Sequence, residues 1–283
     1  MVTQRSIWRT PLLGLSYVIL ILVALMMLVP FIWIIATSLQ PSGTQFSYPP
    51  QLLPQKIDWS NYTRLFTLAP FGQYFANTAF ITALTVLGQL LLCSMAAYGF
   101  ARLNFIGRDI IFMLYLATMM IPFQITMIPL YLMVFKIGWV NTYQGMIVPG
   151  ISSAYGIFLL RQALLTIPRD YHDAARIDGA GEWRIFTRIF LPLIGPALAT
   201  LGVFAFMGAW TDLLWPLLIA RDQTIWTLEL GLAYFNASSS AFQQTNWPLV
   251  MAAAVLVMLP VLIVYFFAQR YFVAGISLSG VKG

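Results

Sequence analysis

Asp212 is the only acidic residue that lies deep within an apolar run of this chain. Ala205, Gly208 and Trp215 precede and follow it at spacings of three and four residues, which would place all four on one face of a helix. A carboxylate accepts hydrogen bonds from hydroxyl groups, and an indole covers the apolar C–H face of a sugar ring. The pattern favours a path for a polyhydroxylated solute. The alternative is that Asp212 bonds to a neighbouring helix or to a partner protein for stability.

Three uncharged polar residues within apolar stretches, Gln89, Thr118 and Gln124, are further candidates. We include Gln124 with Asp212, Trp215 and Gly208 in the predicted substrate path. A single amide or hydroxyl in a membrane helix also often bonds across to another helix, so a structural role stays open for each of the three.

The sequence offers little for catalysis or metal binding. It has one histidine, His172, and one cysteine, Cys93. Cys93 lies in an apolar run and is expected to be a small core residue, whereas His172 is expected to be solvated or to face a partner. None of the three lysines follows Gly and precedes Ser or Thr, so no phosphate-binding P-loop is present. We predict no catalytic residue, no metal and no cofactor in this chain.

The composition identifies the environment that must position these residues. Of 283 residues, 60% are hydrophobic and only 8% are charged, whereas a soluble domain is about 25% charged. This excludes a soluble enzyme, a nucleic-acid-binding module and a disordered chain. We therefore expect an all-α integral membrane protein, in contact with the lipid bilayer and with no nucleic-acid partner.

Six stretches are apolar and long enough to cross a membrane, which needs about 20 residues. Pro122 and Pro129 interrupt the third of them, which is the least regular. We treat residues 1–283 as a single transmembrane domain. Its predicted spans cover approximately residues 12–37, 74–100, 110–135, 143–165, 196–220 and 248–269.

The basic residues predict the orientation of these spans, because Lys and Arg are enriched in cytoplasmic loops. With the N-terminus inside, eleven of the fifteen basic residues lie inside. The four outside are Lys56, Arg64, Lys136 and Arg221. The reverse orientation would invert this bias, so we predict that both termini are cytoplasmic.

The internal loop at residues 166–195 has the pattern of two short helices. Pro168 suits a first helical turn, and Asp170 and Asp173 suit the positive end of a helix dipole. Gly179 suits the left-handed residue that ends the first helix, and a second helix restarts near Glu182.

This loop resembles the EAA loop of bacterial ABC-importer permeases, which reads E-A-A, D-G-A, an aromatic residue and then I-x-L-P. The corresponding segments here are Asp173-Ala174-Ala175 and Asp178-Gly179-Ala180. The remaining matches are Phe186, Ile189, Leu191 and Pro192. Asp173 departs from the usual Glu, because it keeps the charge but is one methylene shorter.

Further segments, from about Asn77 to the C-terminus, resemble the carbohydrate-uptake branch of that family and its maltose-type inner permease subunit. They are residues 96–102, 118–122, 156–162, 210–212, 215–217 and 280–283. The resemblance implies six helices in the arrangement of a type I importer permease, in the bacterial cytoplasmic (inner) membrane, as a multi-pass subunit.

The resemblance also implies how the chain works. The first short helix would be a coupling helix that sits in a groove of a cytoplasmic ATPase, through Asp173, Ala174, Ala175, Asp178, Gly179 and Ala180. The chain would form half of a sugar path. It would act with a second homologous permease, with two ATPase subunits that bind ATP and Mg, and with an extracytoplasmic solute-binding protein. Without the motif, the loop could instead be an amphipathic segment on lipid headgroups.

The alternative function is an ion-coupled secondary transporter. Such proteins usually carry paired acids or discontinuous helices within the membrane, and Asp212 alone is thin evidence for that. The sequence does not decide which solute is carried. Few basic residues lie near the predicted path, which favours neutral sugars over phosphate esters.

Overall fold

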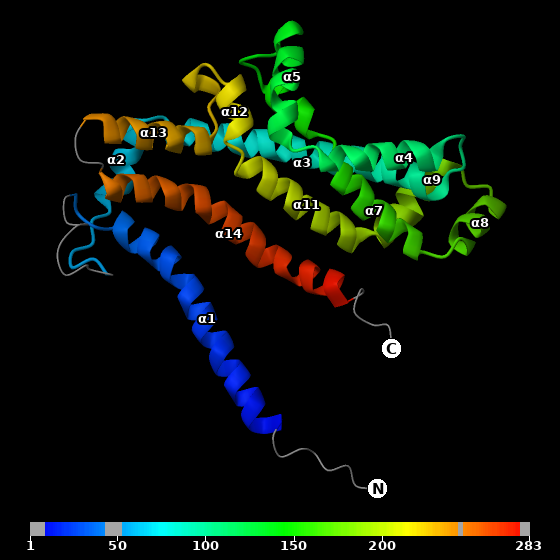
Figure 1. Ribbon diagram of the computed structural model, residues 1–283, viewed down its shortest axis with the longest axis horizontal. Helices are drawn as coiled ribbons and strands as arrows, with labels where there is room; N and C mark the ends of the chain where they lie inside the picture. The colour runs from blue at the N-terminus through cyan, green and yellow to red at the C-terminus, as the bar shows by residue number, and fades with distance from the viewer. Residues whose placement is uncertain (1–8, 43–52, 243–245, 278–283) are drawn as a thin grey trace. The chain divides into compact units, whose positions relative to one another are not determined.

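The computed structural model describes residues 9–42, 53–242 and 246–277, and these residues form helices and connecting turns without a strand. Two compact units divide the chain: residues 1–69 with 235–256, and residues 70–234 with 257–283. Figure 1 shows the helices from α1 to α14. In chain order they are α1 (Arg9–Ser38), α2 (Ser60–Leu68), α3 (Phe71–Arg102), α4 (Arg108–Ala117), η1 (Thr118–Met120), α5 (Phe123–Lys136), α6 (Tyr143–Ile147), η2 (Val148–Gly150), α7 (Ala154–Thr166), α8 (Asp170–Ile177), α9 (Glu182–Ile185), η3 (Phe186–Phe190), α10 (Leu191–Leu193), α11 (Gly195–Trp210), α12 (Leu214–Ile219), η4 (Gln223–Ile225), α13 (Leu228–Phe242) and α14 (Trp247–Ser277).

The first unit contains α1, whose side chains are exposed all the way from Gly14 to Trp33. A helix that is apolar on every side suits lipid rather than water. Its last turn is anchored by α2, because the buried Asn61 donates from Nδ2 to the carbonyl oxygens of Ser38 (3.0 Å) and Gln40 (2.9 Å). These carbonyls have no partner within the helix, so the side chain of α2 satisfies them.

The second unit is built around α3, which packs along both α7 and α11. Gly156 permits this approach, because a Cβ atom there would lie 2.9 Å from Leu201 and 3.1 Å from the sulfur of Cys93. Small residues allow membrane helices to pack closely in this way. Cys93 is fully buried in the resulting core, which confirms its prediction as a core residue.

Three helices are long and apolar enough to cross a membrane: Gly14–Ser38, Phe71–Arg102 and Trp247–Gln269. Three bent pairs of helices also qualify if each pair is one span, and their bends measure 104°, 40° and 79°. Five of the six predicted stretches each fall on one of these helices or pairs, whereas the fifth, 196–220, begins after the 79° bend and extends past the end of α11 at Trp210. Apolar content therefore located the helices, but it did not reveal the bends within the third and fourth stretches.

Pro122 accounts for the sharpest bend. The preceding residue, Ile121, is extended at φ −89° and ψ 115°, which is the conformation that a following proline favours. Pro129, by contrast, lies inside α5 without ending it. The prediction that both prolines interrupt the third stretch was therefore wrong for Pro129.

The fifth predicted span is shorter than expected. We predicted a helix over 196–220, but α11 ends at Trp210, and α12 begins at Leu214 after a non-helical break. Asp212 lies in that break, so Ala205, Gly208, Asp212 and Trp215 do not form one stripe on one helix. Pro216 lies in the first turn of α12, where proline is tolerated, and it marks the new start.

Candidate functional site

The loop between α7 and α11 contains the predicted pair of short helices, α8 and α9. Asp170 and Asp173 occupy the first turn of α8, where the helix dipole stabilises negative charge. Pro168 precedes the helix by two residues instead of lying in its first turn.

Gly179 ends α8 as predicted, with a left-handed φ of +77°. The Gly179 N–H donates to the Arg176 carbonyl (3.0 Å) and the Ala180 N–H to the Ala175 carbonyl (3.0 Å). These two bonds define a Schellman motif, which satisfies the last carbonyls of a helix. Ala175 is buried, and Ala180 packs against the same core, so this turn is fixed on its inner side.

The predicted coupling residues divide between two sides of α8. Ala175 faces the core, whereas Asp173, Ala174, Asp178 and Gly179 are exposed. Beside them, the apolar Tyr171 and Ile177 are also exposed, Ile177 to 86%. One side of this short helix thus belongs to the core, and the other is a mixed apolar and charged surface.

His172 and Glu182 attach α8 and α9 to the end of α3. Glu182 accepts a hydrogen bond from the Tyr98 hydroxyl at 2.8 Å, and the His172 Nε2 atom lies 3.2 Å from the same carboxylate oxygen. His172 is only 9% exposed, so the prediction of a solvated or partner-facing histidine was wrong. No spacing in the sequence indicated this network, because its members come from three separate helices.

Arg102 adds a second attachment at the same end of α3. Its guanidinium donates to the carbonyl oxygens of Leu164 and Ile167, which lie at the end of α7 and just beyond it. It also lies 4.6 Å above the centre of the Phe190 ring, a favourable cation–π geometry. The loop is therefore held against α3 from both α7 and η3.

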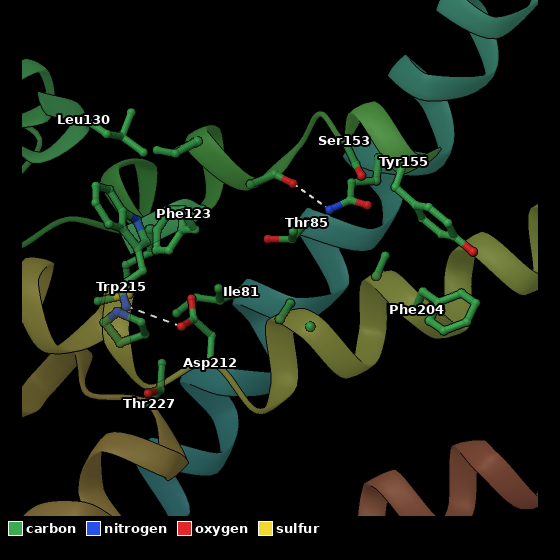
Figure 2. A pocket seen from close by; sticks show the side chains of 18 of the residues that line it. Ile81, Thr85, Phe123, Leu130, Ser153, Tyr155, Phe204, Asp212, Trp215 and Thr227 are labelled. Atoms are coloured by element: carbon green, nitrogen blue, oxygen red, sulfur yellow. Dashed lines mark hydrogen bonds between the residues drawn. The ribbon is translucent and has the colours of Figure 1, made fainter. Parts of the chain in front are cut away.

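A cavity of about 320 Å³ lies within the second unit, between residues of α3, α5, α7, α11 and α12. Asp212, Trp215 and Gly208 line it, together with Ala205, and Figure 2 shows Asp212 beside Trp215. These four predicted residues therefore meet in one cavity, although α11, the break after it and α12 supply them where one helix was expected.

Asp212 is half-buried, and its Oδ1 atom accepts a hydrogen bond from the backbone N–H of Trp215 (3.3 Å). It thereby satisfies one of the free N–H groups at the start of α12. The buried Trp215 donates from its indole to the Gly145 carbonyl (2.9 Å), and its ring meets Phe123 edge-on. The indole N–H is thus used within the fold, and the Asp212 carboxylate is the charged group that the described lining presents to a ligand.

The other polar candidates lie differently. Gln124 and Thr118 are exposed and do not line the cavity, so the role of Gln124 in the substrate path stays a prediction that this cavity does not support. Gln89 does line it, and donates to the Gly150 carbonyl at 2.7 Å. Thr85, one turn earlier on α3, was missed. Thr85 lies four residues before Gln89, so the two share one face of the helix, and this spacing could have identified Thr85.

Comparisons with known proteins agree with this geometry. A family model described as "Binding-protein-dependent transport system inner membrane component" matches residues 89–278. The chain is 36% identical over 264 residues to the arabinooligosaccharides transport system permease protein AraQ of Halalkalibacterium halodurans, covering 92% of this chain and 93% of that protein. It is 33% identical over 267 residues to the sn-glycerol-3-phosphate transport system permease protein UgpE of Yersinia enterocolitica, covering 92% and 94%.

A solved structure supports the same fold. The structure of a bacterial ABC transporter involved in the import of the acidic polysaccharide alginate includes a chain that matches with a TM-score of 0.82 and 27% identity. The match covers 93% of this chain and 97% of that one, which confirms the predicted fold of an ABC-importer permease. The chain is a member of the family of binding-protein-dependent transport system inner membrane components.

Proposed function

We propose that this chain is the membrane-spanning subunit of an ATP-driven importer, and that it forms half of the path for a neutral sugar or sugar-like solute. The observation that carries the proposal is the construction of α8. This helix exposes Asp173, Ala174 and Ile177 while its other side is built into the core. A short helix held this way can receive a force from a partner and pass it on.

The proposed mechanism follows from how α8 is attached. A cytoplasmic ATPase pair binds ATP and Mg, closes, and displaces α8, since this chain itself has no P-loop. The displacement reaches α3 through the contacts of Tyr98 with Glu182 and of Arg102 with α7. Gln89, which lines the cavity, is nine residues before Tyr98, or about 14 Å along the helix. One straight helix therefore links the loop to the cavity.

The lining of the cavity favours a neutral cargo. Among the described residues that line it, Asp212 is the only charged one, and none is Lys, Arg or His. A phosphate ester or an acidic sugar would meet a carboxylate with no cation beside it, which is unfavourable in a partly dry site. The relatives' names cover an arabinooligosaccharide and a glycerol phosphate, and we assign this chain to the neutral class.

We further propose six spans with both termini inside the bacterial cytoplasmic membrane. A second homologous permease would complete the path, and an external binding protein would deliver the solute. Single cysteines at two exposed positions test the orientation: Gln223→Cys on the proposed outside and Ile177→Cys on the proposed inside. The native Cys93 is buried and should not react. Labelling of position 177 from outside intact cells would overturn the topology.

Asp212→Asn tests the cavity as the solute path. The asparagine keeps the Oδ1 acceptor for the Trp215 N–H, while it removes the charge and replaces the other oxygen by an NH2 group of similar size, so folding and assembly should be normal. Loss of a charge-assisted bond to the solute, worth about 1.5–3 kcal/mol, should lower ATP-driven uptake by tenfold or more. Asp58→Asn is the matched control, because Asp58 is also half-buried and likewise accepts a backbone N–H, from Ser60 at 2.9 Å, but does not line the cavity.

Two outcomes would contradict the proposal. Uptake by Asp212→Asn at the wild-type rate would exclude the cavity as the path. Accumulation of solute by the purified single chain, driven by a proton or sodium gradient without ATPase subunits, would favour an ion-coupled secondary transporter instead.

A further inference from the structure

A second cavity, of about 480 Å³, lies at the end of α3 beside α8 and α9. Its charged lining comprises Arg102, Arg169, Arg176, Asp173 and Glu182. The mechanism proposed above uses the attachment of Arg102 to α7, but it gives the cavity itself no role. Three guanidinium groups around one cavity are costly to hold together unless an anion balances them.

The two acids of this cavity, Asp173 and Glu182, offset only two of its three guanidinium charges. Glu182 is bonded by Tyr98 and His172, and the Asp173 carboxylate lies 3.6 Å from His172 Nδ1. In the part of the chain that the structure describes, the side chains of Arg169 and Arg176 form no hydrogen bond or ion pair, and the Nε atom of Arg102 is buried without an acceptor. The cavity therefore has free cationic donors, and planar guanidinium groups match the oxygens of a phosphate.

The turn that follows α3 indicates where that phosphate comes from. Phe105 lines the cavity and is 44% exposed, and its neighbour Ile106 is fully exposed. Exposed apolar side chains next to arginines, at the end of a helix long enough to cross a membrane, are typical of the lipid interface. There the apolar side chains enter the acyl region, and the arginines reach the headgroups.

We propose that this cavity binds the phosphate group of an anionic phospholipid of the cytoplasmic leaflet, through Arg102, Arg169 and Arg176. The proposal rests on the proposed function in one respect, because that function places this loop on the cytoplasmic side. Since Arg169 and Arg176 flank and belong to α8, the bound headgroup helps to fix the position of the coupling helix. Anionic lipid then raises the coupling of ATP hydrolysis to transport.

The test compares two double variants of the assembled transporter in phosphatidylcholine nanodiscs with and without phosphatidylglycerol. Arg169→Gln with Arg176→Gln removes two charges from the cavity. Arg184→Gln with Arg188→Gln removes two exposed charges from the same loop outside the cavity. Native mass spectrometry counts the retained phosphatidylglycerol, and ATPase assays measure its activating effect.

We expect retention of phosphatidylglycerol to fall by roughly fivefold per arginine in the cavity variant, with a parallel loss of activation by this lipid. The control variant should behave as the wild type. Equal losses in both variants would overturn the site. Full activation by inorganic phosphate in pure phosphatidylcholine would overturn the lipid as the source. Loss of ATPase subunits from the cavity variant in both lipid mixtures would show that the arginines bind the ATPase instead.

The lipid count does not depend on transport, whereas sugar uptake by the wild-type complex tests the proposed function. A complex that transports sugar but retains no phosphatidylglycerol would therefore overturn the lipid site alone. A chain that retains the lipid but takes up no sugar with its partners would overturn the proposed function alone.

Discussion

Replacing Gly179 by serine changes the backbone at one position of the loop between α8 and α9 without disturbing a neighbour. A Cβ atom at this position would meet nothing within 4 Å. Its effect therefore comes only from the left-handed φ of +77°, where a residue with a Cβ atom costs about 1–2 kcal/mol.

The strain opposes the two hydrogen bonds that end α8, from Gly179 to Arg176 and from Ala180 to Ala175. A cost of about 1–2 kcal/mol reduces the population of this turn by a factor of roughly 5–30 relative to its open forms. If the ATPase binds only the loop with the turn formed, its apparent affinity falls by the fraction of competent loop that is lost. Asparagine tolerates the left-handed conformation better, so Gly179→Asn should lie between serine and the wild type.

Gly181 supplies the control two residues further along. It precedes α9 with φ −73° and ψ 157°, and a Cβ atom there also meets nothing within 4 Å. This conformation suits any residue, and serine is a preferred residue at the start of a helix. Gly181→Ser adds the same atoms to the same loop, and no loss is expected.

The assay is the binding of the purified ATPase subunit to the permease in detergent, measured by titration, together with solute uptake in proteoliposomes. The expected order of affinity is wild type and Gly181→Ser, then Gly179→Asn, then Gly179→Ser. Equal affinity of the two serine variants would refute the argument that the left-handed turn shapes the ATPase-binding surface. Tighter binding by Gly179→Asn than by the wild type would refute it as well.

Three further predictions concern other parts of the chain. Tyr98→Phe removes the hydroxyl that donates to Glu182, a bond worth about 1.5–3 kcal/mol, so uptake per ATP hydrolysed should fall while the ATPase still binds. Gly231→Ala places a Cβ atom 2.3 Å from the buried ring of Tyr74, and this overpacking should cost about 1–3 kcal/mol in thermal unfolding of the purified protein. Burial raises the pKa of the Glu229 carboxyl. The folded protein therefore loses stability as the pH rises above the pKa that this carboxyl has in the unfolded chain. Glu229→Gln should therefore unfold at a higher temperature than the wild type at neutral pH, and at the same temperature in acid.

Matched controls exist for the first two of these changes. Tyr115→Phe removes a hydroxyl whose contact with Ser152 (2.7 Å) is exposed, so coupling should not change. Gly72→Ala adds a Cβ atom that meets nothing within 4 Å, so unfolding should be unaffected. If Tyr98→Phe and its control change coupling equally, the hydrogen bond to Glu182 is not the cause. If Gly231→Ala and its control change unfolding equally, the contact with Tyr74 is not the cause. A lower unfolding temperature for Glu229→Gln at neutral pH would contradict the effect of burial.

Local features of the sequence predicted much of this fold. Apolar runs located the long helices, because each run must be buried in lipid or protein whatever its neighbours are. Gly179 was predicted correctly as a left-handed residue, since a helix signal ends immediately before it. The same reasoning could have revealed the break in the fifth span, because Asp is a residue type that favours the start of a helix and Pro216 follows Asp212 by only four residues.

Other parts of the site depend on contacts between distant segments, which one sequence does not reveal. His172 is buried because Tyr98 and Glu182 come from other helices to meet it. Gln124 and Gln89 are both amides in apolar runs, yet only Gln89 lines the cavity, because the bend at Pro122 determines where the side chains of α5 lie. Composition alone cannot distinguish two such residues.

Two hydrophobic clusters of the second unit indicate how the loop and the cavity act together. In one cluster, Ala175 of α8 and Ile185 of α9 pack with residues of α3, α7 and α11. In the other, α5, α6 and α12 pack around Trp215 and the Ile81 side of α3.

The cavity is lined from both clusters, by Leu201 of the first and Trp215 of the second. In the proposed mechanism, a force on α8 would act first on the wall that α3, α7 and α11 form, because packed interiors transmit displacement. The wall from α5 and α12 follows breaks at Pro122 and Asp212, where the chain can absorb a change in angle. This order explains why Gly179→Ser should weaken binding of the ATPase, whereas Tyr98→Phe should leave binding intact and weaken the transmission that follows it.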